Sequence, residues 1–276
     1  VWSARDQTLY WVSAPEGEVW SWDLVGAPYR RLVGTTLGCV ALREGPEGSL
    51  VLGGESAVLA VDARDSFEPR VLCQRPDRTS ATRPNDGRVD RQGRLVFGMY
   101  NNYHRAGASA AENNAGMFRL GPDLETEEIL DYRFRCSNVI CFPEGGDTIY
   151  FCDTPTRKIY AFDYGERLTN RRLVWTMPAA LPGGPDGANV DAEGFLWVAL
   201  SGAGRVVRIN PLTGAVDVVV HLPVSSPTSV TFGGEHLDEL FITTRGPDGG
   251  GLYRMKMPFG IVGLPEPEFK VNDDQQ

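Results

Sequence analysis

The chain carries, at positions 83–90, the stretch Arg-Pro-Asn-Asp-Gly-Arg-Val-Asp, followed at 93–98 by the alternating run Gly-Arg-Leu-Val-Phe-Gly. The alternating run predicts a β-strand. The first stretch places a guanidinium, an amide and a carboxylate just before that strand, where a fixed scaffold can present polar side chains to a ligand. Taken alone, these residues favour a β-turn in which Asn85 and Asp86 bond their own backbone and Gly87 adopts a positive φ. The recurrence of the pattern along the chain favours the binding site instead.

The pattern recurs six times. Each copy consists of strand-sized segments bounded by Gly, Pro, Asp and Asn, with almost no helical periodicity. The predicted copies span residues 1–34, 39–73, 86–132, 138–177, 186–222 and the chain from residue 228 onward. A four-strand unit repeated about every 35–45 residues is typical of a propeller blade. Because one meander cannot bury both of its faces, the blades must stack around an axis.

The sequence therefore predicts an all-β fold, a six-bladed β-propeller that forms a single domain over residues 1–276. Residues 100–114, rich in Gly, Ala and Asn, are expected to form a long loop inside the third blade. Loops of this length often act as lids or binding loops.

Charge and composition exclude several classes of partner. The formal net charge of −9 argues against nucleic acid or an anionic membrane, whose phosphates would repel the protein. The longest apolar runs are strand-sized, so none is expected to span a bilayer. No signal peptide opens the chain, although its first residue, Val1, leaves room for a start further upstream.

The five cysteines include no Cys-x-x-Cys pair, which favours buried thiols in a reducing, cytoplasmic compartment. The three histidines are too scattered for a histidine zinc site, and only His104 lies near the polar stretch.

Polar residues occupy the same place in four of the repeats, just before the Gly-x-aromatic strand: Asn85, Asn138, Asp186 and Ser229. In a propeller the first strand of each blade lines the central channel, so these side chains are predicted to converge at one mouth of it. Convergent oxygen atoms suit a hard or borderline divalent cation. The alternative is a polar channel that holds only water.

The segments that carry this pattern resemble a signature of the gluconolactonase / regucalcin (senescence marker protein) / luciferin-regenerating enzyme family. Agreement begins at residues 83–98 and continues in order at 137–139, 150–157, 185–187, 191–199 and 232–234. The resemblance thus covers nearly the whole chain. It implies a six-bladed propeller with one divalent metal ion, Ca²⁺ or Zn²⁺, and hydrolysis of a sugar lactone in carbohydrate metabolism.

The resemblance also implies roles for particular residues. Asn138 and Asp186 would bind the metal, and Arg83 and Asn85 would contact the substrate. Many family members place an acidic substrate contact where this chain has Asn-Asn-Tyr at 101–103, so Tyr103 and its neutral neighbours are expected to alter the sugar preference.

A further acidic metal ligand of the family stands just before the Val-Trp that is Val1-Trp2 here. Either a preceding segment, which would also close the last blade, is missing from this chain, or the metal has lost a ligand. Glu16 and Glu18 are not expected to replace it, because they fall in the turn and second strand of the first blade.

Lactone hydrolysis needs an electrophile for the carbonyl and a base for water. A divalent ion can supply the first, and Asp186, the one carboxylate mapped to the ring, is the candidate base as well as a ligand. Arg83 would stabilise developing negative charge or hold sugar hydroxyls. The chain has no Gly-x-Ser-x-Gly elbow, which disfavours covalent serine catalysis. The alternatives are a metal-dependent esterase or phosphotriesterase, and a non-catalytic metal- or protein-binding propeller.

Overall fold

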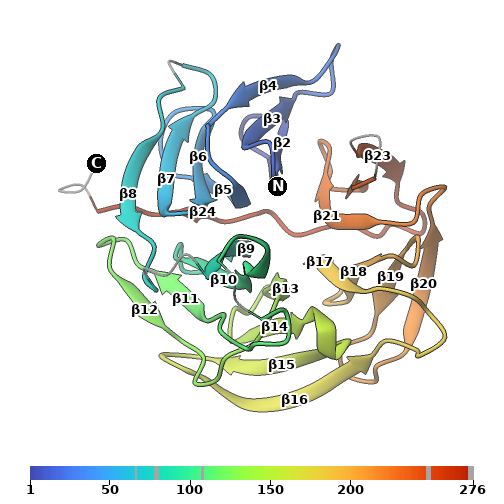
Figure 1. Cartoon of the computed structure of the whole chain (residues 1–276). Helices are drawn as coiled ribbons and strands as arrows, with labels where there is room; N and C mark the ends of the chain where they lie inside the picture. The colour runs from blue at the N-terminus through green and yellow to red at the C-terminus, as the bar shows by residue number, and fades with distance from the viewer. Residues whose placement is uncertain (66, 78–80, 107–108, 247–249, 273–276) are drawn as a thin grey trace. The chain divides into compact units, whose positions relative to one another are not determined.

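The computed structural model describes residues 1–65, 67–77, 81–106, 109–246 and 250–272. The chain forms two compact units, one made of Val1–Cys136 with Pro265–Gln276 and the other of Ser137–Leu264. Every sheet of the described chain belongs wholly to one unit, and the strands that Figure 1 labels carry the numbers used here. We call these the first unit and the second unit.

The first unit contains three sheets, with strand orders β1-β2-β3-β4, β24-β5-β6-β7-β8 and β12-β11-β10-β9. All neighbours are antiparallel except β24, which runs parallel to β5. The bounds are β1 Trp2–Ser3, β2 Thr8–Ser13, β3 Glu18–Trp22, β4 Tyr29–Leu32, β5 Leu37–Arg43, β6 Ser49–Gly54, β7 Ala57–Asp62, β8 Arg70–Gln74, β9 Thr82–Val89, β10 Leu95–Asn101, β11 Met117–Leu120, β12 Thr126–Glu128 and β24 Glu268–Phe269, with the short helix α1 at Tyr103–Ala106.

The second unit also contains three sheets, with strand orders β13-β14-β15-β16, β17-β18-β19-β20 and β21-β22-β23. The bounds are β13 Ser137–Cys141, β14 Thr148–Asp153, β15 Lys158–Tyr164, β16 Leu168–Thr176, β17 Gly184–Val190, β18 Leu196–Ser201, β19 Arg205–Ile209, β20 Val216–His221, β21 Pro227–Gly233, β22 Glu239–Thr244 and β23 Gly251–Lys256. A single turn of 3-10 helix, η1, follows β14 at Thr154–Thr156.

The six sheets confirm the six predicted repeats and the all-β class. The sixth sheet has three strands in the described part of the chain, one fewer than the predicted unit. The third sheet begins at Thr82, earlier than predicted, because residues 83–89 are themselves a strand. The β-turn interpretation of this stretch is wrong: Gly87 lies opposite Phe97 in the ladder between β9 and β10. Ladder hydrogen bonds outweigh the turn preference of Asn-Asp-Gly here.

The first strand of five sheets is interrupted by a bulge at the same place in the repeat. In the first unit the register shifts between Leu37 and Cys39 in β5, and opposite Gly98/Met99 in β9, where Asn85 is the extra residue. In the second unit it shifts between Asn138 and Cys141, between Pro185 and Ala188, and between Pro227 and Ser229. A bulge re-aims side chains and is common beside functional sites.

The opposite end of the first strand is closed by an Asp-x-x-Gly turn in two sheets, at residues 90–93 and 191–194. The aspartate side chain accepts backbone N–H groups of the turn, and the glycine takes a positive φ, 88° for Gly93 and 83° for Gly194. Large apolar side chains such as Trp197 and Phe232 fill the space between sheets of the second unit, with ring centroids 5.8 Å apart.

The predicted loop at 100–114 lies between β10 and β11, and its residues 107 and 108 fall outside the described residues. Within the described chain no helix is long and apolar enough to cross a membrane. The five cysteines, all described, are free thiols; Cys39, Cys141 and Cys152 are buried, as predicted, whereas Cys73 and Cys136 are half-buried.

Candidate active site

Asn138 and Asp186, the two predicted metal ligands, lie side by side in the second unit. Asn138 is in β13 and 5% exposed, whereas Asp186 is in β17 and half-buried. The end of the Asn138 amide that faces Asp186 lies 3.0 Å from Asp186 Oδ1 and 3.1 Å from the Ser137 carbonyl oxygen. Both residues stand at the bulges of their strands, so the bulges bring the two side chains to one place.

The other end of the Asn138 amide contacts Thr154 of η1. The Nδ2 group of Asn138 donates to Thr154 Oγ1 at 2.8 Å, and Thr154 Oγ1 donates to the Pro185 carbonyl oxygen, also at 2.8 Å. With its NH₂ group on the Asp186 side instead, the amide would donate to Asp186 Oδ1 and to the Ser137 carbonyl, and its oxygen would accept from Thr154 Oγ1 at 2.8 Å. With its oxygen on that side, the amide, the Asp186 carboxylate and the Ser137 carbonyl present three oxygen atoms to a cation.

Such a donor set suits a divalent cation. Carboxylate, amide and backbone carbonyl oxygens are the ligands of hard cations, and two oxygens about 3 Å apart can both bind one ion. No group of three His, Cys, Asp or Glu side chains able to hold a metal occurs in the described ranges. The candidate site therefore depends on amide and carbonyl oxygens for most of its donors.

The backbone beside Asn138 is strained. Val139 has a φ of 64° and is fully buried. A β-branched residue in this region is a rare outlier, and such strain is tolerated where the surrounding structure fixes it, often at functional sites. The strain coincides with the bulge of β13 and helps to fix the direction of the Asn138 side chain.

Ser229, the third ring residue of the second unit, lies next to the bulge of β17. A Cβ on Gly187 would lie 2.4 Å from Ser229 Oγ, so only glycine allows β17 and β21 to approach this closely. The structure thus brings Ser229 beside the residue that follows Asp186.

Arg83 and Asn85, the predicted substrate contacts, lie together at the bulge of β9 in the first unit. The Arg83 Nη1 group donates to the Pro84 carbonyl at 2.9 Å and to Asn85 Oδ1 at 3.3 Å. The guanidinium also lies 4.6 Å from the ring centroid of Tyr100, within the range of a cation–π contact. The Asn85 Nδ2 group donates to Cys136 Sγ at 3.7 Å.

Tyr103, the third predicted substrate contact, reaches this cluster through Tyr100. It opens helix α1, and its ring centroid is 6.3 Å from that of Tyr100. Burial, followed by the neighbouring Tyr103, raises the pKa of Tyr100 to about 12, and the charge of Arg83 opposes the shift. At neutral pH Tyr100 is therefore a phenol that can donate a hydrogen bond.

Asn101 and Asn102, which precede Tyr103, bind the protein itself. Both hydrogens of the Asn101 amide are donated within the loop, to the carbonyl oxygens of Ser109 and Glu112. The Asn102 amide donates to Glu55 Oε1 at 3.5 Å. That this segment alters the sugar preference stays a prediction. Tyr103 is its member that lies next to Tyr100, on whose ring Arg83 packs.

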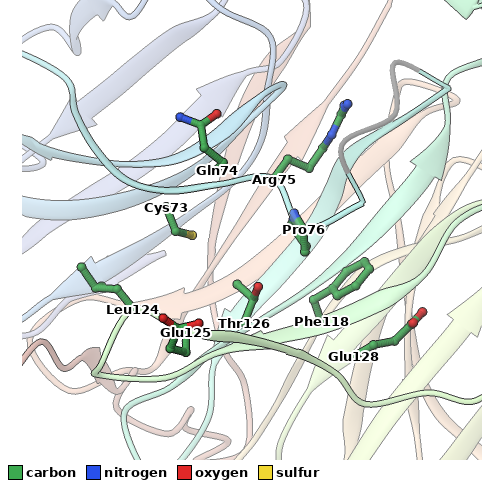
Figure 2. Close-up of a pocket in the computed structure, with 9 residues that line it drawn as sticks. All are labelled: Cys73, Gln74, Arg75, Pro76, Phe118, Leu124, Glu125, Thr126 and Glu128. Atoms are coloured by element: carbon green, nitrogen blue, oxygen red, sulfur yellow. The ribbon is translucent and has the colours of Figure 1, made fainter.

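A surface pocket in the first unit, shown in Figure 2, lies between the end of β8 and the strands β11 and β12. Its volume is about 470 Å³. It is lined by Cys73, Gln74, Arg75, Pro76, Phe118, Leu124, Glu125, Thr126 and Glu128. None of the predicted site residues borders this pocket, and we assign it no role.

The predicted residues thus form two clusters, one in each unit. Arg83, Asn85 and Tyr103 belong to the first unit, and Asn138 and Asp186 to the second. That the two clusters serve one site stays a prediction. Tyr100 and Thr154 contact these clusters but were not singled out from the sequence. Thr154 stands in a segment that matches the family signature, and this match was the one signal that could have indicated it.

Comparisons with known proteins agree with these observations. The family described as "SMP-30/Gluconolactonase/LRE-like region" matches residues 1–246. Regucalcin of Xenopus laevis is 31% identical over 279 residues, 96% of this chain and 91% of that protein. L-arabinolactonase of Azospirillum brasilense is 32% identical over 246 residues, 88% of this chain and 78% of that protein.

Solved structures extend the likeness to the fold. A luciferin-regenerating enzyme has a TM-score of 0.88 at 23% identity and covers 98% of this chain and 94% of its own. A protein of Agrobacterium tumefaciens described as a calcium-binding protein, regucalcin, has a TM-score of 0.85 at 19% identity and covers 98% of this chain and 92% of its own. The fold is a six-bladed β-propeller, as predicted from the repeats.

Proposed function

The chain belongs to the SMP-30/gluconolactonase/LRE-like family, and from this premise we propose that it is a metal-dependent hydrolase that opens sugar lactones. The observation that carries the proposal is that the Asn138 amide lies 3.0 Å from Asp186 Oδ1 and 3.1 Å from the Ser137 carbonyl oxygen. The similarity to L-arabinolactonase supports a sugar lactone as the small-molecule substrate.

Asn138 and Asp186 are the proposed ligands of one divalent cation, Ca²⁺ or Zn²⁺. When bound, the cation would polarise the lactone carbonyl and lower the pKa of water. The all-oxygen donor set favours a hard cation such as Ca²⁺, in agreement with the description of the Agrobacterium relative as calcium-binding.

Asp186 is also the proposed general base. Its carboxylate is half-buried, so water can reach it, and it would accept a proton from the attacking water. It would then return the proton to the alkoxide oxygen of the opened ring. The proton taken from water thus ends on the hydroxyl group of the product, a hydroxy acid, and the Asp186 carboxylate is regenerated.

Arg83, Asn85 and Tyr103 are the proposed substrate contacts. The Arg83 guanidinium lies over Tyr100 and donates to Asn85, and these contacts would orient it toward sugar hydroxyls or developing negative charge. The phenol of Tyr103 supplies a neutral donor and acceptor. A polyhydroxylated lactone ring needs such paired donors and acceptors around its edge.

A substrate screen tests this proposal. Aldonolactones, aryl esters and organophosphates are offered to the protein with and without added Ca²⁺, Zn²⁺ or Mn²⁺, and acid release is followed with a pH indicator against an enzyme-free control. We expect metal-stimulated turnover of the sugar lactones above the other two classes. Preference for aryl esters or organophosphates would overturn the substrate class. If the protein binds a metal but turns over none of these substrates, it is a metal-binding protein and not an enzyme of this class.

A further inference from the structure

Thr154 connects the two strands that carry the proposed metal ligands. It opens η1, accepts a hydrogen bond from Asn138 of β13, and donates one to the carbonyl of Pro185 in β17. Both hydrogen bonds are 2.8 Å long. Pro185 is the residue directly before Asp186. One hydroxyl group thus contacts a residue of each bulge.

The orientation of the Asn138 amide is coupled to the direction in which Thr154 donates its one hydrogen. In one arrangement the hydrogen of Thr154 is given to the Pro185 carbonyl. Toward Asn138 the hydroxyl can therefore only accept, which requires the NH₂ group of Asn138 on that side. The amide oxygen is then on the side of Asp186 Oδ1 and the Ser137 carbonyl.

The opposite amide orientation would close the site to a cation. The NH₂ group of Asn138 would then donate to Asp186 Oδ1 and to the Ser137 carbonyl. The Thr154 hydroxyl would have to donate to the Asn138 oxygen, and the Pro185 carbonyl would lose that hydrogen. Without a cation this orientation gives the Asn138 amide three hydrogen bonds, one of them from Thr154 Oγ1 at 2.8 Å. The hydrogen bond from Thr154 to Pro185 stabilises the other, cation-binding orientation and so competes with the internal Asn138–Asp186 hydrogen bond.

The position of Thr154 is itself fixed by packing. A Cβ on Gly184 would lie 2.7 Å from Thr154 Cγ2, so glycine at the start of β17 makes room for the threonine methyl group. Thr156, in the same helical turn, points elsewhere, because its hydroxyl donates to the Asp153 carbonyl at 2.7 Å.

We propose that Thr154 is a positioning residue for cation binding, which turns the oxygen of Asn138 toward the cation shared with Asp186. The inference rests on the proposed function in one respect: it takes the ligand of Asn138 and Asp186 to be a divalent cation. Partners that orient a metal ligand typically change metal affinity about 10- to 100-fold when they are removed.

The test measures cation affinity by calorimetry with Ca²⁺, Zn²⁺ and Mn²⁺ in turn. Thr154→Val and Thr154→Ala both remove the hydroxyl and should weaken binding about 10- to 100-fold. Thr154→Ser keeps the hydroxyl and should restore binding to near the wild-type Kd. Thr156→Val, which removes a hydroxyl from the same helical turn, should leave the Kd unchanged. Thermal unfolding without metal verifies that each variant is folded.

A double-mutant cycle separates orientation from a merely structural role. Asn138→Asp replaces the amide with a carboxylate, whose two ends are both oxygen. The orientation of residue 138 then no longer matters, so Thr154→Val should cost much less cation affinity in this background than in wild type. An equal cost in both backgrounds would overturn the proposal.

The outcomes also distinguish the inference from the proposed function. If wild type binds a cation and the hydroxyl-free variants bind it equally well, the role of Thr154 is refuted and the lactonase proposal stands. If the variants lose affinity but wild type opens no lactone, the inference stands and the lactonase is refuted. If wild type binds no divalent cation, both are refuted.

Discussion

The two ends of β17 each carry an aspartate, and the two carboxylates have opposite surroundings. Asp191, just after the strand, is fully buried. Its Oδ1 accepts the backbone N–H groups of Glu193 and Phe195, and its Oδ2 accepts the indole N–H of Trp197 and the Nε–H of Arg208. Asp186, at the bulge, is half-buried, and its Oδ1 lies 3.0 Å from the amide of Asn138.

The contrast separates a carboxylate held by structural contacts from one that we propose to be functional. Four donors surround Asp191, and its charge is compensated by a buried arginine that also contacts Glu193 and Asp217. These contacts hold the pKa of Arg208 well above its ordinary value, against the effect of burial. Asp186 instead lies beside the Asn138 amide, with which we propose that it binds a cation. We expect substitutions at the two ends to separate stability from turnover.

Asp186→Asn should have the largest effect on turnover. It replaces an anionic ligand with a neutral amide and removes the proposed proton acceptor, a role that contributes about 10²- to 10⁴-fold in rate. The fold should persist, because the residue is half-buried and the replacement has the same shape. Steady-state kinetics with rising metal concentration measures both roles. If excess metal restores near wild-type turnover, Asp186 is a ligand only and the base lies elsewhere.

Asp191→Asn should show the opposite result. It places an NH₂ group against N–H donors and weakens a buried ion pair, so the free energy of unfolding should fall by about 3 kcal/mol. Urea unfolding measures this loss. Turnover per folded molecule should stay near wild type at a temperature where the variant is folded. A large loss of turnover with unchanged stability would remove the distinction between the two ends.

A divalent cation should stabilise the protein against unfolding only when Asp186, at the bulge of β17, is unchanged. At a cation concentration of about 100 times Kd, the gain in unfolding free energy is about 2.7 kcal/mol. Wild type and Asp191→Asn should both gain it, and Asp186→Asn should gain little. Thermal unfolding with and without a chelator measures the difference. Equal gains in all three proteins would place the cation at another site.

Arg83→Lys tests the corresponding bulge in β9, and it should have the smallest effect on turnover. Lysine keeps the charge but loses the planar contact with Tyr100 and the hydrogen bond to Asn85. A cation–π contact contributes about 0.5–1 kcal/mol, so kcat/KM should fall a few-fold, through KM. Arg94→Lys is the matched control, because Arg94 pairs with Asp90 at the other end of the same strand. A loss for Arg83→Lys greater than that for Asp186→Asn would contradict the assigned roles.

Much of the fold could be predicted because the repeat is visible in the sequence. Strand-sized segments at regular spacing predicted the six sheets, and the polar residues at the same place in four of the repeats indicated Asn85, Asn138 and Asp186 as site residues. The extent of β9 was misjudged, since Asn-Asp-Gly is a turn sequence and only pairing with β10 makes it a strand. Local preference and tertiary pairing disagree at this site, as is common where side chains must be re-aimed.

Thr154 and Tyr100 could not be predicted, because their roles depend on contacts and not on spacing. Thr154 of η1 contacts Asn138 in β13 and Pro185 in β17. The spacing of these residues in the sequence does not indicate that they meet. The bulges could not be predicted either. No residue type in β13 signals the register shift after Asn138, and valine at position 139 gives no sign of a positive φ. Sequence periodicity locates strands, but it does not report which residues they leave unpaired.

The parallel pairing of β24 with β5 has a consequence for how the chain folds. Glu268 pairs with Leu42 and Phe269 with Arg43, so the second sheet receives its fifth strand from residues made long after the other four. During synthesis one edge of β5 stays unpaired until the ribosome has released the segment that contains β24. Contacts between such distant residues raise the contact order and slow folding, although the entropy of closing a longer loop grows only slowly. We therefore expect closure of this edge to be a late step, and the open edge to be the point at which nascent chains are most prone to associate.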